Sequence, residues 1–287
     1  MIFNLGSINA DYIYRVPHLP APGETLAASD MTRGLGGKGA NQSVAAALAG
    51  SQVTHIGAVG PDGGWAVEAL MGYGVITSQI ATVDTPTAHA IINVDRAGEN
   101  AIVIYPGANH EQSLSWLETA LSIASHSDLL LLQNETSLQV EAAEMAHKSG
   151  LHVVYSAAPF SAEAVQAVLP YLDLLVMNAV EATQLTTALG LSLEDIPVRQ
   201  LLITRGADGA DWIENSEKTH CPAFAVTPVD TTGAGDCFTG YVAAGLDQGL
   251  SPKDAMRRAA AASALQVQRP GTAEAIPTAT EVASFLA

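Results

Sequence analysis

Residues 128–135 read Asp-Leu-Leu-Leu-Leu-Gln-Asn-Glu, an apolar run of strand length that ends in polar side chains. Similar apolar runs, separated by helix-like stretches, follow along the chain: runs at 152–155, 173–177 and 201–204, helices at 138–148, 162–169 and 179–189. Short apolar strands that alternate with helices are typical of βαβ units around a buried parallel sheet. This part of the chain therefore predicts an α/β fold.

The same signals predict the elements on either side of this region. We expect strands at 1–8, 53–59, 87–95 and 101–105, and helices at 41–49, 234–248 and 253–268. The Gly-containing loop 96–100 joins two of these strands and suits a hairpin. Because this hairpin is amphipathic rather than uniformly apolar, we expect it to lie outside the main sheet with one face exposed.

Polar side chains follow the apolar strands at the point where each strand ends. In open α/β sheets, ligands bind beyond the carboxyl ends of the strands. We therefore expect one crevice, lined by Glu135, Asn178, Glu181, Thr204 and Gly206. The alternative is that polar residues simply terminate strands, and for any single residue the two interpretations are equally good.

The composition is that of a folded, acidic protein. The 287 residues allow one large domain or two modest ones, and 48% of them are hydrophobic. The 12 basic and 29 acidic residues give a net charge of −17, which disfavours nucleic acid and acidic membranes as partners. A phosphorylated ligand is still compatible with this charge, because backbone N–H groups and bound cations can hold a phosphate.

Two further observations bear on the compartment. No apolar run approaches the roughly 20 residues of a membrane helix, and the N-terminus shows no basic region of a signal peptide. Cys221 and Cys237 are the only cysteines, so we expect neither a disulfide framework nor a zinc site. These features favour a cytoplasmic protein with buried free thiols.

The segment 229–236, Val-Asp-Thr-Thr-Gly-Ala-Gly-Asp, has the strongest chemical signature. Its small residues allow the N–H groups of Gly233, Ala234 and Gly235 to converge at a helix N-terminus, where the helix dipole favours an anion. Asp236 stands in the first turn of that helix. An anion site beside a carboxylate suits phosphoryl transfer to a hydroxyl, with Asp236 accepting the hydroxyl proton. An acid is also an ordinary helix-start residue, but this explains Asp236 alone.

The segment 34–42, Gly-Leu-Gly-Gly-Lys-Gly-Ala-Asn-Gln, formally matches the dinucleotide pattern G-x-G-x-x-G. That pattern needs a strand immediately before it, and the polar stretch 26–33 predicts none, so we reject a dehydrogenase. The segment is not a Walker A loop either, since Gly39 follows Lys38. Its glycines allow the backbone to approach a small ligand closely, and Asn41 can hydrogen-bond a hydroxylated ligand.

Two shorter segments are ambiguous. Asn9-Ala10-Asp11, directly after the first strand, is either a turn or a ligand-binding pair. Asn178 and Glu181 share one face at the start of a helix, where they can orient water on Mg²⁺. The same spacing is equally typical of a capping box.

Several motifs together carry a family resemblance. They are Gly-Gly-Lys-Gly-Ala-Asn at 36–41, Asn-x-x-Glu at 178–181 and Asp-Thr-Thr-Gly-Ala-Gly-Asp at 230–236, with supporting segments at 6–11, 22–25, 98–100 and 107–109. The chain resembles the PfkB carbohydrate kinases, and within them the ribokinase branch, from Gly6 to Pro277. The resemblance implies a single ribokinase-like domain over 1–287, a three-layer α/β/α fold with a mostly parallel central sheet. It also implies a small β-sheet lid from about 11–33 and 86–106.

The resemblance implies an ATP-dependent sugar kinase that uses Mg²⁺ and phosphorylates a primary hydroxyl. It assigns Asp236 as the catalytic base and Gly233, Ala234 and Gly235 as the anion hole. The positions that match sugar-binding residues are Asn9, Asp11, Gly37, Lys38, Asn41, Ile102, Glu135 and Asp236. The positions that match the nucleotide site are Asn178, Thr204, Arg205, Gly206, Gly209 and Gly235. Glu181 matches the residue that organises hydrated Mg²⁺, and a K⁺ site is matched by Asp230, Thr232, Arg269 and Gly271.

The chain departs from the family pattern in two places. Gln266 and Ala275 stand where small and hydroxyl residues are usual near the cation, which puts K⁺ activation in question. The loop 204–209 is more charged than usual, and its Arg205 either contacts phosphate or points to solvent.

The resemblance also bears on partners and substrate. In similar enzymes two lids pair into a homodimer, which would cover the apolar face of the hairpin, and lid closure would exclude water. We expect D-ribose as the sugar, because the set Asn9, Asp11, Gly37, Asn41 and Glu135 is complete. The alternatives are a nucleoside, fructose or ketodeoxygluconate as substrate, or a catalytically silent sugar-binding regulator, which the intact Asp236 argues against.

Overall fold

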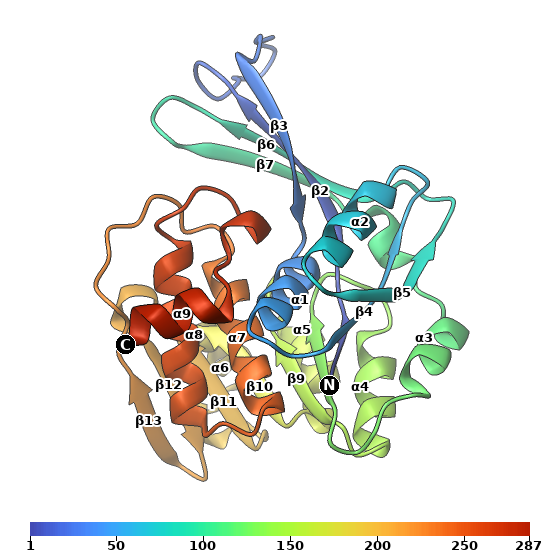
Figure 1. The fold of residues 1–287 in the computed structure, drawn as a ribbon, viewed down its shortest axis with the longest axis vertical. Helices are drawn as coiled ribbons and strands as arrows, with labels where there is room; N and C mark the ends of the chain where they lie inside the picture. Colours follow the sequence, from blue (N-terminus) through green and yellow to red (C-terminus); the bar gives the residue numbers. More distant parts are fainter.

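The computed structural model describes residues 1–287 and shows a three-layer α/β/α body with a smaller sheet standing away from it (Figure 1). The central sheet has nine strands in the order β13-β12-β11-β10-β9-β8-β1-β4-β5. Neighbouring strands are parallel except at β12, which is antiparallel to both β11 and β13. The strands are β1 (Ile2–Leu5), β4 (Val53–Val59), β5 (Ile76–Thr82), β8 (Leu129–Gln133), β9 (His152–Ser156), β10 (Leu174–Asn178), β11 (Gln200–Thr204), β12 (Ala210–Glu214) and β13 (Glu217–Cys221). The predicted α/β architecture is confirmed.

Helices cover both faces of this sheet. One hydrophobic core lies under α1 (Lys38–Leu48), α2 (Gly64–Gly72), α7 (Ala234–Asp247), α8 (Pro252–Gln266) and α9 (Ala279–Leu286). A second core lies under α3 (Leu114–Leu121), α4 (Gln139–Lys148), α5 (Ala162–Val168) and α6 (Ala179–Leu189). None of these helices has the length and apolar character that crossing a membrane requires. Both cysteines are buried free thiols, as expected.

The leucine run of β8 shows why uniformly apolar strands mark this sheet. Leu129 and Leu131 enter the first core, whereas Leu130 and Leu132 enter the second. Successive side chains of a strand point to opposite faces, so a sheet covered on both sides needs apolar residues at every position. The polar residues that follow therefore emerge at the edge where the strands end.

The smaller sheet forms the lid, with strands in the order β3-β2-β6-β7. They are β2 (Asn9–Arg15), β3 (Asp30–Gly36), β6 (Ala88–Val94) and β7 (Asn100–Tyr105). The predicted hairpin is β6–β7, an antiparallel pair. All six residues of β7 are exposed, so the lid carries unpartnered apolar side chains in one copy of the chain.

Strand β3 corrects one sequence-based argument. We expected no strand before the Gly-rich segment, yet β3 runs directly into Gly37 and helix α1. The signal was absent because the first four residues of β3 are exposed and need no apolar alternation. The rejection of a dinucleotide site still stands, because β3 pairs with β2 in the lid and does not belong to the central parallel sheet.

Candidate active site

Asp236 lies in the first turn of α7 and is only 8% exposed. The residue before the helix, Gly233, has a φ of 74°, in the left-handed region that glycine tolerates best. Asn41 Nδ2 donates to Asp236 Oδ2 over 3.2 Å, and Gln42 Nε2 donates to Oδ1 over 3.0 Å. Two side-chain amides of α1 therefore orient this carboxylate, and its remaining lone pairs can accept a hydroxyl proton.

The turn before α7 lines a small cavity of about 190 Å³ beside Asp236. Gly233, Ala234 and Gly235 all belong to its lining. The N–H of Ala234 donates to the Thr231 carbonyl over 3.2 Å, whereas the N–H groups of Gly233 and Gly235 have no hydrogen-bond partner. Of the three amides predicted to form an anion hole, two are therefore ready to bind an anion.

The strand-end residues expected in one crevice lie in adjoining places. Asn178, Glu181 and Thr204 line the small cavity, and Thr204 also lines a larger cavity together with Gly206. Glu135 lines neither cavity and accepts a hydrogen bond from the Lys38 N–H. The expected single crevice is therefore two adjoining cavities, which four of the five residues line.

Lys38, Glu135 and Asp11 form a charged cluster next to Asp236. Glu135 Oε2 accepts from the Lys38 backbone N–H over 3.0 Å and from the Ser7 hydroxyl. Burial raises the pKa of Glu135, and the negative charge of Asp236 raises the pKa of Lys38. Burial, together with the nearby Glu135 carboxylate, raises the pKa of Asp11 to about 7. These shifts indicate a partly dehydrated polar site that lacks enough cations to neutralise its acids.

Three more of the predicted sugar-binding residues lie near this cluster: Asn9 at the start of β2, Gly37 before α1 and Asn41 on α1. Asn41 Oδ1 is buried without a hydrogen-bond partner, so a ligand hydroxyl would satisfy it. Asn9 Oδ1 accepts from Asn109 Nδ2 over 2.8 Å, and Asn109 Oδ1 accepts from the Ile8 N–H over 2.9 Å. Gly37 has a φ of 90°, and a side chain there would meet the Ser7 carbonyl at 2.9 Å. Asn109 is thus a positioning residue to which the sequence motif alone had assigned no role.

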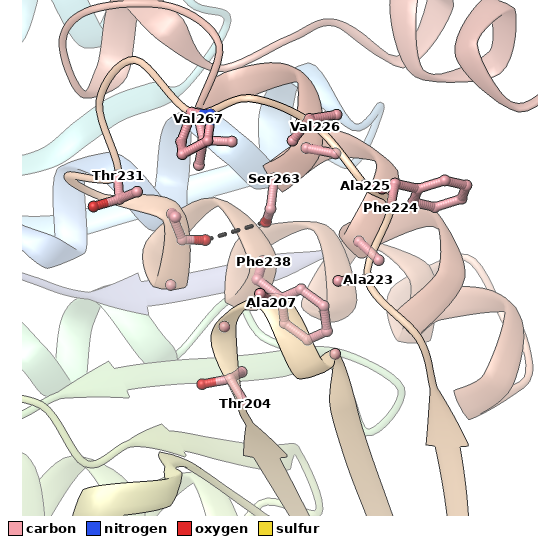
Figure 2. Close-up of a pocket in the computed structure, with 17 residues that line it drawn as sticks. Thr204, Ala207, Ala223, Phe224, Ala225, Val226, Thr231, Phe238, Ser263 and Val267 are labelled. Carbon is pink, nitrogen blue, oxygen red and sulfur yellow. Dashed lines mark hydrogen bonds between the residues drawn. The ribbon is translucent and has the colours of Figure 1, made fainter.

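The larger cavity has a volume of about 580 Å³ and a mostly apolar lining (Figure 2). Figure 2 shows Phe224 and Phe238 beside it and the Ser263 hydroxyl donating to the Ala234 carbonyl over 3.2 Å. The predicted nucleotide-site residues Thr204, Gly206 and Gly209 belong to its lining, as do Phe224, Val226, Phe238 and Val267, which the sequence analysis missed. Thr204, Thr231, Ala234 and Gly235 line both cavities, so the two cavities adjoin.

Asn178 and Glu181 take up one of the two roles that the sequence left open, the capping box. They form a capping box, in which Asn178 Oδ1 accepts from the Glu181 N–H and Glu181 Oε2 accepts from the Asn178 N–H. Both also line the small cavity. Burial raises the pKa of Glu181, which places a carboxylate of restricted hydration beside the Asp236 site.

Arg205 takes neither of the two expected roles. Its Nε donates to Asp211 Oδ2 over 2.6 Å, and Asp211 also pairs with Lys218 and His220. Asp211 is 1% exposed, and hydrogen bonds from Lys218, His220 and Arg205 lower its pKa to about 2. Arg205 therefore neutralises a buried carboxylate and lines neither cavity.

The residues matched to a monovalent-cation site lie close together. Asp230 Oδ1 accepts from the Thr232 N–H over 2.9 Å, and its Oδ2 accepts from the Gly271 N–H over 3.1 Å. Arg269 Nη2 pairs with Glu281 over 2.6 Å, and its Nη1 donates to the Ala275 carbonyl over 3.5 Å. Both oxygens of the Asp230 carboxylate are thus already engaged by the backbone.

Both departures from the family pattern fall at this same place. Gln266 is 1% exposed, and its Nε2 donates to the Thr232 carbonyl over 3.3 Å. Ala275 is buried and has no hydroxyl to offer. At this place the Gln266 amide therefore already donates one hydrogen bond to the Thr232 carbonyl, which was matched to the cation site.

Ile102, which was matched to a sugar contact, is 51% exposed on β7. The strand register nevertheless puts it on the lid face that carries Asp11. Ile102 pairs with Ile92 and Ile92 pairs with Ile13, two residues beyond Asp11 on β2. Side chains two residues apart share a face, so Ile102 points to the same side of the lid as Asp11.

Comparison with known proteins defines the class of this site. The family model described as pfkB family carbohydrate kinase matches residues 1–279. The chain belongs to this family and is an ATP-dependent carbohydrate kinase.

Individual relatives are similar over their full length. A ribokinase of Haemophilus influenzae is 36% identical over 98% of this chain and 97% of its own. A deoxyribokinase of Salmonella typhi is 32% identical over 98% of this chain and 97% of its own. The solved structure of Arabidopsis thaliana ribokinase complexed with ribose and ATP is 30% identical, covers 99% of this chain and 98% of its own, and superimposes with a TM-score of 0.89. Similarity therefore includes the lid and both cavities.

Proposed function

We propose that this kinase transfers the γ-phosphoryl group of ATP to the 5-hydroxyl of D-ribose, yielding ribose 5-phosphate and ADP. Asp236 takes the hydroxyl proton, the hydroxyl oxygen bonds to the γ-phosphorus, and the bond to the β–γ bridging oxygen breaks. The N–H groups of Gly233 and Gly235 stabilise the charge on the transferring group. The observation that carries the proposal is the buried Asp236 carboxylate beside these two unpaired amides.

The polar cluster on the lid side supplies the sugar site. Asp11 and Glu135 accept hydrogen bonds from sugar hydroxyls, and the Asn41 carbonyl oxygen gains the partner it lacks. Asn9 and the backbone at Gly37 complete the wall. Lys38 balances the carboxylates of this site, as its raised pKa indicates. The similarity to ribokinases at 34–36% identity supports ribose as the sugar.

The larger cavity supplies the nucleotide site. Its apolar lining, with Phe224 and Phe238, suits the faces of an adenine ring. Thr204 and Gly235 line both cavities, so a triphosphate can extend from the larger cavity toward Asp236. Asn178 and Glu181 lie beside the smaller cavity, where the phosphates would come.

The donor set fits Mg²⁺ held through water. The structure contains no cluster of three or more metal-ligating side chains, and Mg²⁺ keeps several waters and binds phosphate oxygens readily. Glu181 would hold that hydrated ion. When bound, Mg²⁺ would offset the negative charge of the phosphates.

No monovalent cation is needed in this proposal. The amide of Gln266 engages the Thr232 carbonyl, and the backbone engages Asp230. The hydrogen bond from Gln266 holds the turn before Gly233 in place of an ion. Activity without added K⁺ is therefore expected to equal activity with it.

The lid mediates a homodimer and closes over the sugar. Ile102, Val103, Ile104 and Tyr105 are 43–68% exposed in one copy, an unusual density of apolar side chains on one strand. A second lid would cover them and shield the unpaired edge of β7. The chain then acts in the cytoplasm on small molecules, with no nucleic acid or membrane partner.

The deciding experiment is a coupled ADP-release screen over pentoses, 2-deoxyribose, hexoses, sugar acids and nucleosides. We expect the highest kcat/KM with D-ribose, and Asp236→Asn to lose about 10²- to 10⁴-fold in kcat while still binding an ATP analogue. A nucleoside or deoxyribose that exceeds ribose by more than tenfold would overturn the choice of substrate. Sugar binding without ADP release by the wild type would favour a silent regulator.

A further inference from the structure

The amide that holds Asp236 is itself held by a buried chain of polar side chains. Gln42 Oε1, at the other end of the amide that binds Asp236, accepts from Gln133 Nε2 over 2.8 Å. The same Gln133 nitrogen donates to Asn4 Oδ1 over 2.9 Å. The members of this amide chain, all 0% exposed, are Asn4, Gln42, Ser43, His55 and Gln133.

The two hydrogens of the Gln133 amide determine how Gln42 faces Asp236. Because one of them occupies Gln42 Oε1, the nitrogen of Gln42 must face the carboxylate. A flipped Gln42 would place a carbonyl oxygen against Asp236 and an NH₂ group against the NH₂ group of Gln133. Both contacts are repulsive in a buried site, so Gln133 permits only one orientation.

At the other end of the amide chain, from Asn4 to His55, each hydrogen bond also has only one possible donor and acceptor. Asn4 Nδ2 donates to the Gly39 carbonyl over 2.8 Å and to Ser43 Oγ over 2.7 Å. Ser43 Oγ lies 2.8 Å from His55 Nδ1, and His55 Nε2 lies 3.1 Å from the Gly6 carbonyl. A carbonyl can only accept, so Nε2 carries the hydrogen, Nδ1 accepts from Ser43, and Ser43 accepts from Asn4. Burial lowers the pKa of His55 to about 4, which keeps this ring neutral.

The amide chain ties together the elements whose relative position matters for transfer. Asn4 lies on β1, Gln133 at the end of β8, Gln42 on α1 and Asp236 on α7. Gly39 packs directly against Gly6, the residue that follows β1. A Cβ atom at Gly39 would lie 2.3 Å from Gly6 Cα. The amide chain therefore holds both the start of α1, which contributes to the sugar site, and the base on α7.

We propose that Gln42 and Gln133 are positioning residues for phosphoryl transfer: Gln133 orients the Gln42 amide, and Gln42 holds the Asp236 carboxylate in the rotamer that reaches the sugar hydroxyl. Neither residue lines the two cavities, so both act through Asp236 and not on a ligand. The proposal rests on the role of Asp236 in the proposed function. Small displacements of a reacting group cost much of its advantage, so losing either amide lowers kcat without changing KM.

The test is a double-mutant cycle with Gln42→Met and Gln133→Met, which keep side-chain length and remove the hydrogen bonds. We expect kcat to fall about tenfold in Gln42→Met and about threefold in Gln133→Met, with KM for ribose and ATP within twofold of wild type. In the Gln42→Met background, Gln133→Met should lower kcat no further, because its effect passes through Gln42. The matched control is Gln139→Met, a buried amide on α4 that bonds Thr136 outside the amide chain.

Each alternative outcome has a distinct meaning. Additive losses of kcat in the double variant, or an equal loss in Gln139→Met, would mean that the amides act only through general stability. A Gln42→Met enzyme as fast as wild type would overturn the proposal outright. If a methionine variant does not fold, as judged by thermal unfolding, Gln42→Asn or Gln133→Asn takes its place, because the shorter amide cannot reach its partner. A wild type that releases no ADP with ribose would contradict the proposed substrate instead, and the cycle would then use the best sugar of the screen.

Discussion

The Asp11 carboxyl, which we propose to bind the sugar, also affects the stability of the ligand-free protein. Its pKa rises from 3.8 to about 7 through burial and the charges of Glu135 and Glu274. The raised pKa means that the folded protein retains this proton to a higher pH than the unfolded chain does. The free energy of unfolding therefore falls as pH rises from about 4 to 7 and stays low above pH 7.

The size of the effect follows from the two pKa values. Each pH unit between them corresponds to about 1.4 kcal/mol, so the whole interval corresponds to about 4 kcal/mol above pH 7. Reorientation of the half-buried side chain toward water recovers part of this cost, and we expect about 2 kcal/mol to remain. Asp11→Asn removes the charge and should therefore stabilise the ligand-free protein at alkaline pH.

The assay is urea unfolding of wild type and Asp11→Asn at pH 5 and pH 8.5 without sugar. We expect the variant to exceed wild type by about 2 kcal/mol at pH 8.5 and by less than about 1 kcal/mol at pH 5, while its sugar kinase activity is largely lost. Asp84→Asn, on the exposed loop between β5 and β6, is the control and should show no such pH dependence. A variant less stable than wild type at pH 8.5, or a gap of the same size at both pH values, would refute the reasoning.

Three further predictions concern the cation, the nucleotide loop and the lid. Initial rates of the wild type with 100 mM K⁺ and with a bulky organic cation should agree within twofold. Gln266→Ala should make the rate depend on K⁺. A strong K⁺ requirement in the wild type would contradict the role given to Gln266. Arg205→Ala should leave KM for ATP within twofold but lower the unfolding temperature, because the buried Asp211 carboxylate loses one of its partners. A tenfold rise in KM would show a phosphate contact instead. Ile104→Asp should convert a dimer to a monomer in light scattering, and a wild-type monomer at micromolar concentration would disprove lid pairing.

The sequence predicted the six inner strands of the central sheet, because burial on both faces produces uninterrupted apolar runs. It did not predict the strands at the two edges, β5, β12 and β13. The strand at 53–59 and the helix at 179–189 agree with the structure at both ends, and the runs at 128–132 and 201–204 differ by one residue. The lid was harder, because β3 is exposed over its first four residues and carries no apolar pattern. Its existence came from family resemblance and from the amphipathic hairpin.

In the candidate site, too, some residues have a clear sequence signal and others have none. Asp236 and its glycines were identified because charged and small residues at a helix start have few structural explanations. Phe224 and Phe238 were missed, since an aromatic residue in a cavity has the same sequence signature as one in the core. Gln42 and Gln133 were missed as well, because the amides that satisfy them come from distant segments that only the fold brings together. Arg205 was left open for the same reason, since its partner Asp211 lies on the next strand.

The charge of the site explains how so acidic a protein can bind ATP. Lys38 is the only cationic residue among those that line the two cavities, and Glu181 and Asp236 line the smaller one with it. A free triphosphate would meet net repulsion there, so the hydrated Mg²⁺ and the amides of Gly233 and Gly235 must supply most of the attraction. These amides are dipoles at the N-terminus of α7, so they attract phosphate without adding a cationic side chain to the site. In the proposed function, a chain with a net charge of −17 can therefore hold a triphosphate with Lys38 as the one cationic side chain that lines the two cavities.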